Sequence, residues 1–266
     1  MLMDLMVALV IGVLQGLLEW LPVSSSGHIM LVLTYVFNLS LSSSFKFSMI
    51  AHLGTVFSAI IYFRREVLLA VKSFLNLNFR EKYLGFIFLT TLFSLVTGLP
   101  IYLFLKTTLE EFSLDVFTLL FSLLLLFTGV VLFLSRRREK GKRFSDLCLR
   151  DMIVLGLAQG FSVLPGVSRS GITTGVLMLR GYSPEASLKA SFLASILVVL
   201  GVSLLELAST TGIKADIPVI VVLFSSFLTS IFTITFLMKI ARRLDFTKFL
   251  ILYGLAGVLL SIFIHV

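Results

Sequence analysis

The chain has 266 residues, of which 58% are hydrophobic and 14% charged, and its mean hydropathy is +1.08. A soluble domain of this length needs more charged residues to cover its surface, so the composition excludes that class and indicates a polytopic membrane protein. The formal net charge of +8 is that of many nucleic-acid-binding proteins, but the basic residues gather in short segments between apolar runs, which is typical of membrane orientation. We therefore expect a bilayer and no nucleic-acid partner. The single cysteine, Cys148, excludes an internal disulfide and a thiolate metal site.

The chain opens with a broken apolar segment. Residues 4–21 are predicted to form an apolar helix that stops at Pro22, and a second apolar stretch covers 28–37 after a Ser-Ser-Ser-Gly turn. Each stretch is too short to cross a bilayer core, which takes about 20 residues. Polar backbone is tolerated at membrane depth only under a cover of protein or in a water cavity, so we interpret 4–37 as a re-entrant helix–loop–helix.

Full spans are predicted next at 45–63, 83–104 and 115–135, with 66–80 as an amphipathic surface helix. A basic loop, 136–143, separates these from a second broken segment at 150–180. The last three spans are predicted at 184–207, 217–238 and 247–265. The first of them starts with a serine cap, a proline and an early acid, Ser183-Pro184-Glu185, which is a favourable helix beginning.

The fold class that follows is an all-α polytopic membrane protein with two inverted-topology repeats, each a re-entrant helix–loop–helix plus three transmembrane helices. Residues 1–266 form one integral membrane domain, with 1–135 as the first repeat and 150–266 as the second. An odd number of spans in each half forces the halves into opposite topologies. Counting basic residues places loop 136–143 inside and both termini outside.

Two short motifs recur at the same offset along the chain, once in each broken segment. The first is Gly-x-x-Gln-Gly, at Gly12 and at Gly156, which we interpret as close helix packing at its glycines. The second is Ser-x-Ser-Gly, at Ser24 and at Ser168. Most of the polar chemistry of an apolar chain therefore lies at two predicted loop tips.

These tips carry the residue types of a phosphate site. Serine hydroxyls and free N–H groups at a helix start form an anion cradle, and an arginine fork, here Arg169, matches phosphate. If the tips converge, then Arg169, both serine groups, Glu19 and His28 surround one anionic group. That set holds a nucleophile, an acid/base pair and an oxyanion stabiliser, as phosphoryl transfer or hydrolysis requires. A lone histidine within a span, His52, is interpreted as a packing residue.

The motifs resemble a known family. Gln15-xxx-Glu19 resembles an [E/Q]xxxE motif, and residues 165–173 (PGVSRSGIT) resemble a PGxSRSxxT motif. Together with LPVSSSGH at 21–28 and AHLGT at 51–55, they are similar to the undecaprenyl-diphosphate phosphatase family, also called the bacitracin-resistance family.

The resemblance implies removal of one phosphate from a C55-type polyprenyl diphosphate, at a site open to the outer face of the plasma membrane. This reaction recycles the carrier lipid for cell-wall or glycan synthesis. The catalytic residues that it implies are Glu19, Ser25, His28 and Arg169. The substrate-binding residues are expected to be Gln15, Ser24, Ser26, Ser168, Ser170 and Thr173. The resemblance also implies Mg²⁺ or Ca²⁺, held mainly by the diphosphate because Gln15 replaces a second carboxylate.

A second class of function stays open at this point, a flippase or transporter of polyprenyl phosphate or a related anionic lipid on the same inverted repeat. The acid/base pair beside a serine run favours hydrolysis, since binding alone needs no such pair. The sequence leaves open the prenyl chain length, the metal, the oligomeric state and whether Ser25 or a water attacks.

Overall fold

The architecture was obtained as a computed structural model, which describes residues 5–78, 81–136, 141–209, 217–241, 251–252, 254–255 and 259. Within these residues the protein is all helical, without strands. Five of the helices are long and apolar enough to cross a bilayer, namely α3 (Leu41–Tyr62), α5 (Lys82–Thr108), α6 (Leu114–Arg136), α9 (Pro184–Ser209) and α10 (Ile217–Ile240). They confirm five of the six predicted spans, and most of the sixth, 247–265, lies outside the described residues.

Both predicted broken segments are present. The first is α1 (Leu5–Leu18), a turn, and α2 (Ser25–Tyr35). The second is α7 (Leu149–Gly160), the 3₁₀ turn η2 (Phe161–Val163), a loop, and α8 (Arg169–Leu179). The first helix of each segment, α1 or α7, ends shortly before a proline. Proline disfavours helical conformation in the residue that precedes it.

The predicted position of the Ser-Gly turns was wrong. We expected the second helix of each pair to begin after Ser-x-Ser-Gly, but α2 begins at Ser25 and α8 at Arg169. Serine at the N-cap stabilises this earlier start in α8, where the Ser168 hydroxyl accepts a hydrogen bond from Gly171 N at 3.3 Å. The serines that follow each cap therefore belong to the first helical turn, where the backbone N–H groups lack helical partners.

The helix ends explain the remaining shifts in boundaries. Ser40 caps α3 by accepting from Ser43 N, which starts this helix earlier than the predicted 45. Glu81 caps α5 in the same way, accepting from Leu84 N at 2.7 Å. The amphipathic helix expected at 66–80 is α4 (Arg64–Leu75), with exposed Leu68, Leu69 and Phe74.

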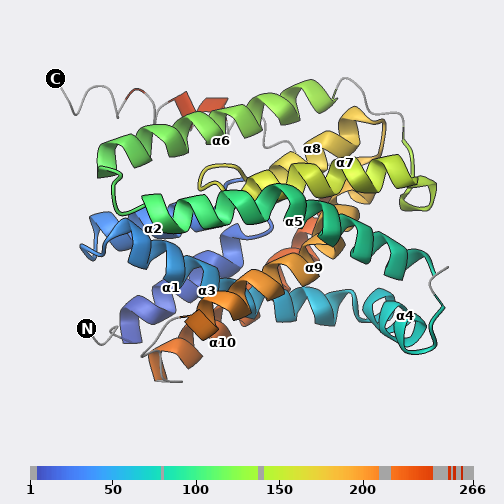
Figure 1. Ribbon diagram of the computed structural model, residues 1–266, viewed down its shortest axis with the longest axis horizontal. Helices are drawn as coiled ribbons and strands as arrows, with labels where there is room; N and C mark the ends of the chain where they lie inside the picture. The colour runs from blue at the N-terminus through green and yellow to red at the C-terminus, as the bar shows by residue number, and fades with distance from the viewer. Residues whose placement is uncertain are drawn as a thin grey trace.

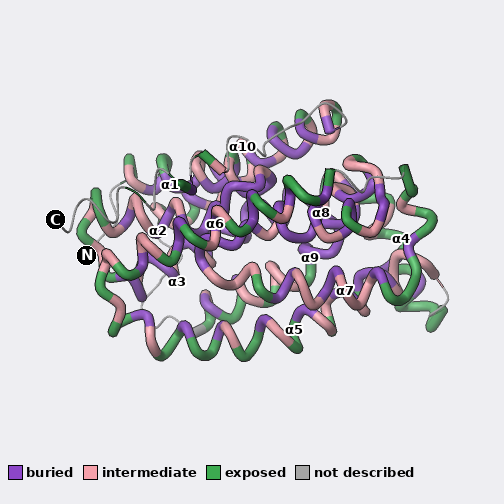
Figure 2. The backbone as a smooth tube through the Cα atoms, turned by 90° about the horizontal axis from the view of Figure 1, so that it is seen from above, coloured by how far each residue is buried: buried purple, intermediate pink, exposed green. Residues whose placement is uncertain are grey.

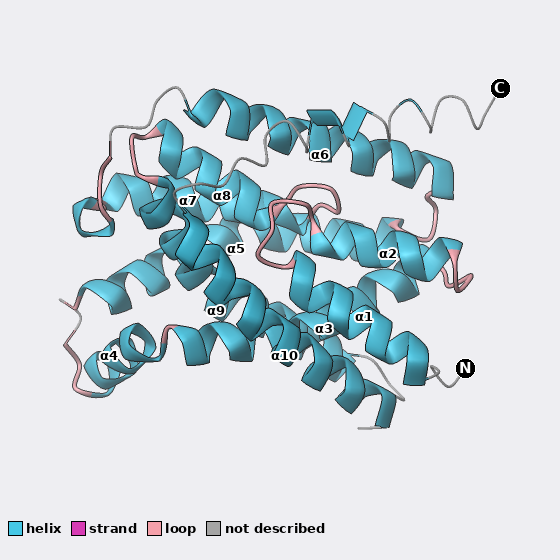
Figure 3. Ribbon diagram, turned by 180° about the vertical axis from the view of Figure 1, so that it is seen from behind, coloured by secondary structure: helices cyan, strands magenta, loops and turns pink. Residues whose placement is uncertain are grey.

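The helices of the two broken segments lie beside the long helices (Figures 1 and 3). Helix α1 runs along α10, and α7 runs along α5. Glycine allows the close approach in both pairs, since a Cβ on Gly16 would lie 2.6 Å from Ser226 O and one on Gly160 would lie 2.7 Å from Ser94 O. Helices α3 and α9 pack together at the centre, where buried residues concentrate (Figure 2). The loops at the ends of α1 and α7 therefore meet in the interior.

Candidate active site

Two loops from distant parts of the chain meet in the middle of the protein (Figure 3). We call residues 19–24 the first tip and residues 164–168 the second tip. The Ser24 hydroxyl accepts a hydrogen bond from Gly166 N at 3.0 Å, and the Ser170 hydroxyl donates to Leu21 O at 2.8 Å. Gly166 has a φ of 110°, and a Cβ there would lie 2.6 Å from Phe121 O, so this position requires glycine. The predicted convergence of the two tips is confirmed.

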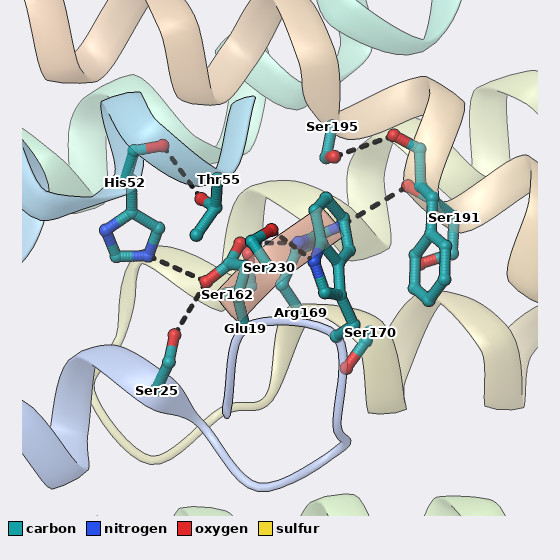
Figure 4. Close-up of polar contacts among 12 residues, drawn as sticks. Glu19, Ser25, His52, Thr55, Ser162, Arg169, Ser170, Ser191, Ser195 and Ser230 are labelled. Carbon is teal, nitrogen blue, oxygen red and sulfur yellow. Dashed lines mark hydrogen bonds and ion pairs between the residues drawn. The ribbon is translucent and has the colours of Figure 1, made fainter. Parts of the chain in front are cut away.

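Glu19 lies at the centre of the meeting point, with only 6% of its surface exposed. Its Oε1 accepts from Arg169 Nη2 at 2.5 Å, and its Oε2 accepts from Ser25 Oγ at 2.7 Å and Gln15 Nε2 at 2.9 Å. His52 Nε2 lies 3.1 Å from the same Oε2 (Figure 4). These five residues are called the Glu19 cluster below. A carboxylate at this depth is costly without compensation, and the cluster supplies both opposite charge and hydrogen-bond donors.

Arg169 is the first residue of α8, and its side chain stacks on the ring of Trp20. Its guanidinium carbon lies 5.1 Å from the centroid of the Trp20 ring, a cation–π geometry. The indole of Trp20 donates to Ser230 Oγ at 2.7 Å and packs edge-on against Phe192. Trp20 was not among the site residues predicted from the sequence, although its position directly after Glu19 in an apolar chain was a usable signal.

The two histidines have the opposite of their predicted places, since His28 was expected beside Glu19 and His52 was expected to be a packing residue. The Nδ1 atom of His28 lies 2.9 Å from Ser24 O, and its ring packs edge-on against Phe121. His52, interpreted as a packing residue, contacts Glu19 instead. The physical reason is direction: in the first turn of α2 the His28 side chain faces α6, whereas the α3 helix presents His52 to the first tip.

The other predicted residues divide into two groups. Ser26 and Ser168 line a cavity of about 340 Å³, together with Glu19, Ser24, Ser25, His52 and Arg169. Ser170 and Thr173 do not line it. The Thr173 hydroxyl lies 2.6 Å from Arg169 O and 2.7 Å from Ser191 Oγ, so it ties the start of α8 to α9. These two residues therefore hold the cavity wall together rather than face the cavity.

The cavity has two chemically different parts. Its polar end is formed by the tips, and a further wall is apolar and lies between α5 and α9. That wall is formed by Leu95 and Leu99 of α5 and by Leu197, Val198, Val202 and Leu205 of α9. Such a shape fits an amphiphile with an anionic head and an apolar chain.

The residues present do not form a cation site of their own. Both oxygens of Glu19 are already occupied by the cluster, in which Arg169, His52 and Gln15 contact them through nitrogen atoms. No group of three His, Cys, Asp or Glu side chains that could hold a metal is found within the described ranges. Divalent cations of the Mg²⁺ or Ca²⁺ type prefer several oxygen ligands, and this donor set does not supply them.

Comparisons with known proteins agree with the geometry. A family model described as "Bacitracin resistance protein BacA" matches residues 8–259. A protein of Methanothrix thermoacetophila named "Undecaprenyl-diphosphatase" is 37% identical over 260 residues, covering 97% of this chain and 98% of its own. Proteins of the same name from Methanococcoides burtonii and Pyrobaculum aerophilum are 36% and 35% identical, and each alignment covers at least 95% of both chains. With Glu19, Ser25 and Arg169 gathered at the converged tips, the chain belongs to the bacitracin resistance protein family.

Proposed function

We propose that this protein hydrolyses a polyprenyl diphosphate, such as undecaprenyl diphosphate, to the monophosphate and inorganic phosphate. The observation that carries the proposal is the 2.7 Å contact between the Ser25 hydroxyl and the Glu19 carboxylate, at the polar end of a cavity with an apolar wall. A hydroxyl on a buried carboxylate is an activated nucleophile. The reaction returns the carrier lipid to cell-wall or glycan synthesis.

In the proposed reaction Ser25 Oγ attacks the terminal phosphorus while its proton moves to Glu19 Oε2. The bond between this phosphorus and the bridging oxygen breaks, and polyprenyl monophosphate leaves. Water then attacks the phosphoserine, Ser25 Oγ leaves and regains a proton, and phosphate is released. Arg169 neutralises charge on the phosphate oxygens, and Ser26 and Ser168 line the same cavity.

Two of the predicted site residues act through a neighbouring residue in this proposal. Gln15 donates to Glu19 and orients the carboxylate. His28 lies against Ser24 O and supports the turn that carries Ser25. A divalent ion of the Mg²⁺ or Ca²⁺ type is proposed to arrive with the diphosphate, since the cluster lacks oxygen ligands for it.

Hydrolysis is favoured over transport by the same contact. A flippase for a phosphorylated lipid needs a cation for the head group and a path for the chain, but no hydroxyl paired with a carboxylate. The test is phosphate release in proteoliposomes. Hydrolysis by the wild-type protein that falls about 10²–10⁴-fold in Glu19→Gln supports the phosphatase. Lipid transfer between leaflets without any phosphate release would support the carrier.

The proposed architecture is an inverted repeat in the plasma membrane, with the cavity reached from the outer side. Reciprocal packing supports it: α1 of the first half packs on α10 of the second, and α7 of the second half packs on α5 of the first. The two ends of the molecule also carry different elements. Helix α4 and the α8–α9 connection lie at one end, and the α5–α6 connection lies at the other (Figure 1).

The natural cysteine offers a direct test of this orientation. Cys148 is an exposed free thiol that follows the basic loop, so we expect an impermeant maleimide to label it only after the membrane is opened. In a Cys148→Ser background, Glu110→Cys is expected to react in intact cells. Labelling of Cys148 in intact cells, or of position 110 only after opening, would refute the orientation.

The apolar wall predicts a site that controls chain length. Gly201 lines the cavity, and no described heavy atom lies within 4 Å of where its Cβ would be. Gly201→Phe is expected to fill the groove without disturbing packing, raising KM for a C55 diphosphate about tenfold or more and affecting a C10 diphosphate much less. One buried aromatic ring is worth about 1.5–3 kcal/mol of apolar contact, which corresponds to this range.

Gly85→Phe is the matched control, because Gly85 is also open at its Cβ but does not line the cavity. We expect it to leave both KM values unchanged. Equal effects of Gly201→Phe on the long and the short substrate would show that the groove does not hold the chain.

A further inference from the structure

His52 is the member of the Glu19 cluster that the proposed reaction has not used. It lies on α3, is 8% exposed and lines the cavity. Its Nδ1 is 2.5 Å from Ser48 O, and its Nε2 is 3.1 Å from Glu19 Oε2. Both ring nitrogens therefore face oxygen atoms of the protein, one from its own helix and one from the first tip.

The two contacts fix what each nitrogen does. A backbone carbonyl only accepts, so Nδ1 carries a hydrogen and donates it to Ser48 O. Nε2 and an ionised carboxylate would repel each other without a proton between them. One proton consequently lies between His52 and Glu19, and the ring is held in a single orientation by the Ser48 carbonyl.

The polar groups of the neighbouring helices have partners of their own. Helix α10 packs on α3 with serines, Ser226 and Ser230, and His28 of α2 contacts Ser24 O. Glu206 of α9 is engaged by Tyr102 and Lys106. The other charge that contacts Glu19 is Arg169, on the opposite carboxylate oxygen.

We expect substrate binding to change the contacts of the Glu19 carboxylate. In the structure Arg169 Nη2 is bonded to Glu19 Oε1. A phosphate that binds the planar fork of the guanidinium competes with Glu19 for its N–H groups. Glu19 then depends on its remaining donors to keep Oε2 directed at the Ser25 hydroxyl, and of these His52 comes from a different helix than the tip itself.

We propose that His52 is the positioning residue that holds Glu19 against Ser25 when Arg169 turns to the diphosphate. The inference rests on the proposed phosphatase function and adds a role within the same site. Because His52 acts on the carboxylate, its loss lowers kcat, whereas the grip on the substrate and hence KM stay close to wild type.

The test compares two amides of different length in purified protein with a polyprenyl diphosphate. Glutamine places its amide nitrogen near the position of Nε2 and can still donate to Glu19, whereas asparagine reaches only the position of Nδ1. We expect His52→Gln to keep kcat within about tenfold and His52→Asn to lose about 10²-fold, since misplacing a catalytic group by about 1 Å costs this much. Both variants are expected to keep KM within a few-fold.

A buried polar residue elsewhere on α3 provides the control. Ser44 is fully buried and bonds Thr34 rather than the cluster, so Ser44→Ala reports the general cost of altering this helix. We expect it to keep both constants near wild type.

Three outcomes would overturn the inference: wild-type kcat in His52→Asn, equal losses in the two amide variants, or a change confined to KM. Equal losses would assign the role to ring packing. Failure of the phosphatase proposal itself is distinguishable, because the wild-type protein would then release no phosphate.

Discussion

Replacing Ser25 by alanine is expected to abolish phosphate release, with a fall in kcat of at least about 10³-fold. Ser25 carries the only hydroxyl of the cluster, and this hydroxyl is bonded to the carboxylate, at 2.7 Å from Glu19 Oε2. Alanine removes the nucleophile and leaves Arg169 in place. Substrate is therefore expected to bind with near-normal affinity, which a binding measurement with radiolabelled polyprenyl diphosphate checks.

The neighbouring serines are the matched controls for Ser25. Ser26 lines the same cavity, and Ser26→Ala is expected to lower kcat much less. Ser24→Ala removes the bond to Gly166 N that joins the two tips, so we expect its main effect on stability. Substantial turnover in Ser25→Ala would assign the attack to water and leave Ser25 as a phosphate ligand.

Arg169→Lys is the second change with a large expected effect, a fall of about 10²-fold in kcat/KM. Lysine keeps the positive charge but loses the planar fork that bonds two phosphate oxygens, and it stacks less well on Trp20, whose ring lies 5.1 Å from the guanidinium carbon. Hydrogen bonds to charged groups contribute about 1.5–3 kcal/mol, which corresponds to this loss. Initial rates over a range of substrate concentrations measure it.

Arg180→Lys controls for the general effect of this exchange. Arg180 pairs with Asp151 at the other end of α8, away from the cavity, and its replacement is expected to leave kcat/KM near wild type. Near-normal kcat/KM in Arg169→Lys, or an equal loss in Arg180→Lys, would contradict the assignment of Arg169 to the phosphate.

The helices were predictable because hydropathy and helix-breaking residues dominate their placement. Apolar runs of about 20 residues fixed five spans, and Pro22 and Pro165 marked the breaks that separate α1 from α2 and α7 from α8. The predicted starts of α2 and α8 were wrong because serine occurs both in loops and in the first turn of a helix.

The charged residues of the site could be predicted from the sequence, but the directions of the other side chains could not. Glu19 and Arg169 stood out because an ionisable residue in an apolar chain is costly and so needs a partner. The same rule applied to His52, but its partner is 33 positions away from it along the chain, at Glu19, and only the fold brings them together. Which serine faces Glu19 likewise depends on the turn that the first tip adopts, with Ser24 in the left-handed region at a φ of 60°.

Isotopically labelled water shows whether the two tips form a site that hydrolyses the terminal phosphoanhydride of a polyprenyl diphosphate. Purified wild-type protein in detergent is given undecaprenyl diphosphate in ¹⁸O water, and both products are analysed by mass spectrometry. Attack on the terminal phosphorus predicts equal amounts of the two products, with ¹⁸O in inorganic phosphate and none in polyprenyl monophosphate. Label in the lipid phosphate, or intact substrate after prolonged incubation with folded protein, would show that the protein does not hydrolyse the substrate at its terminal phosphorus.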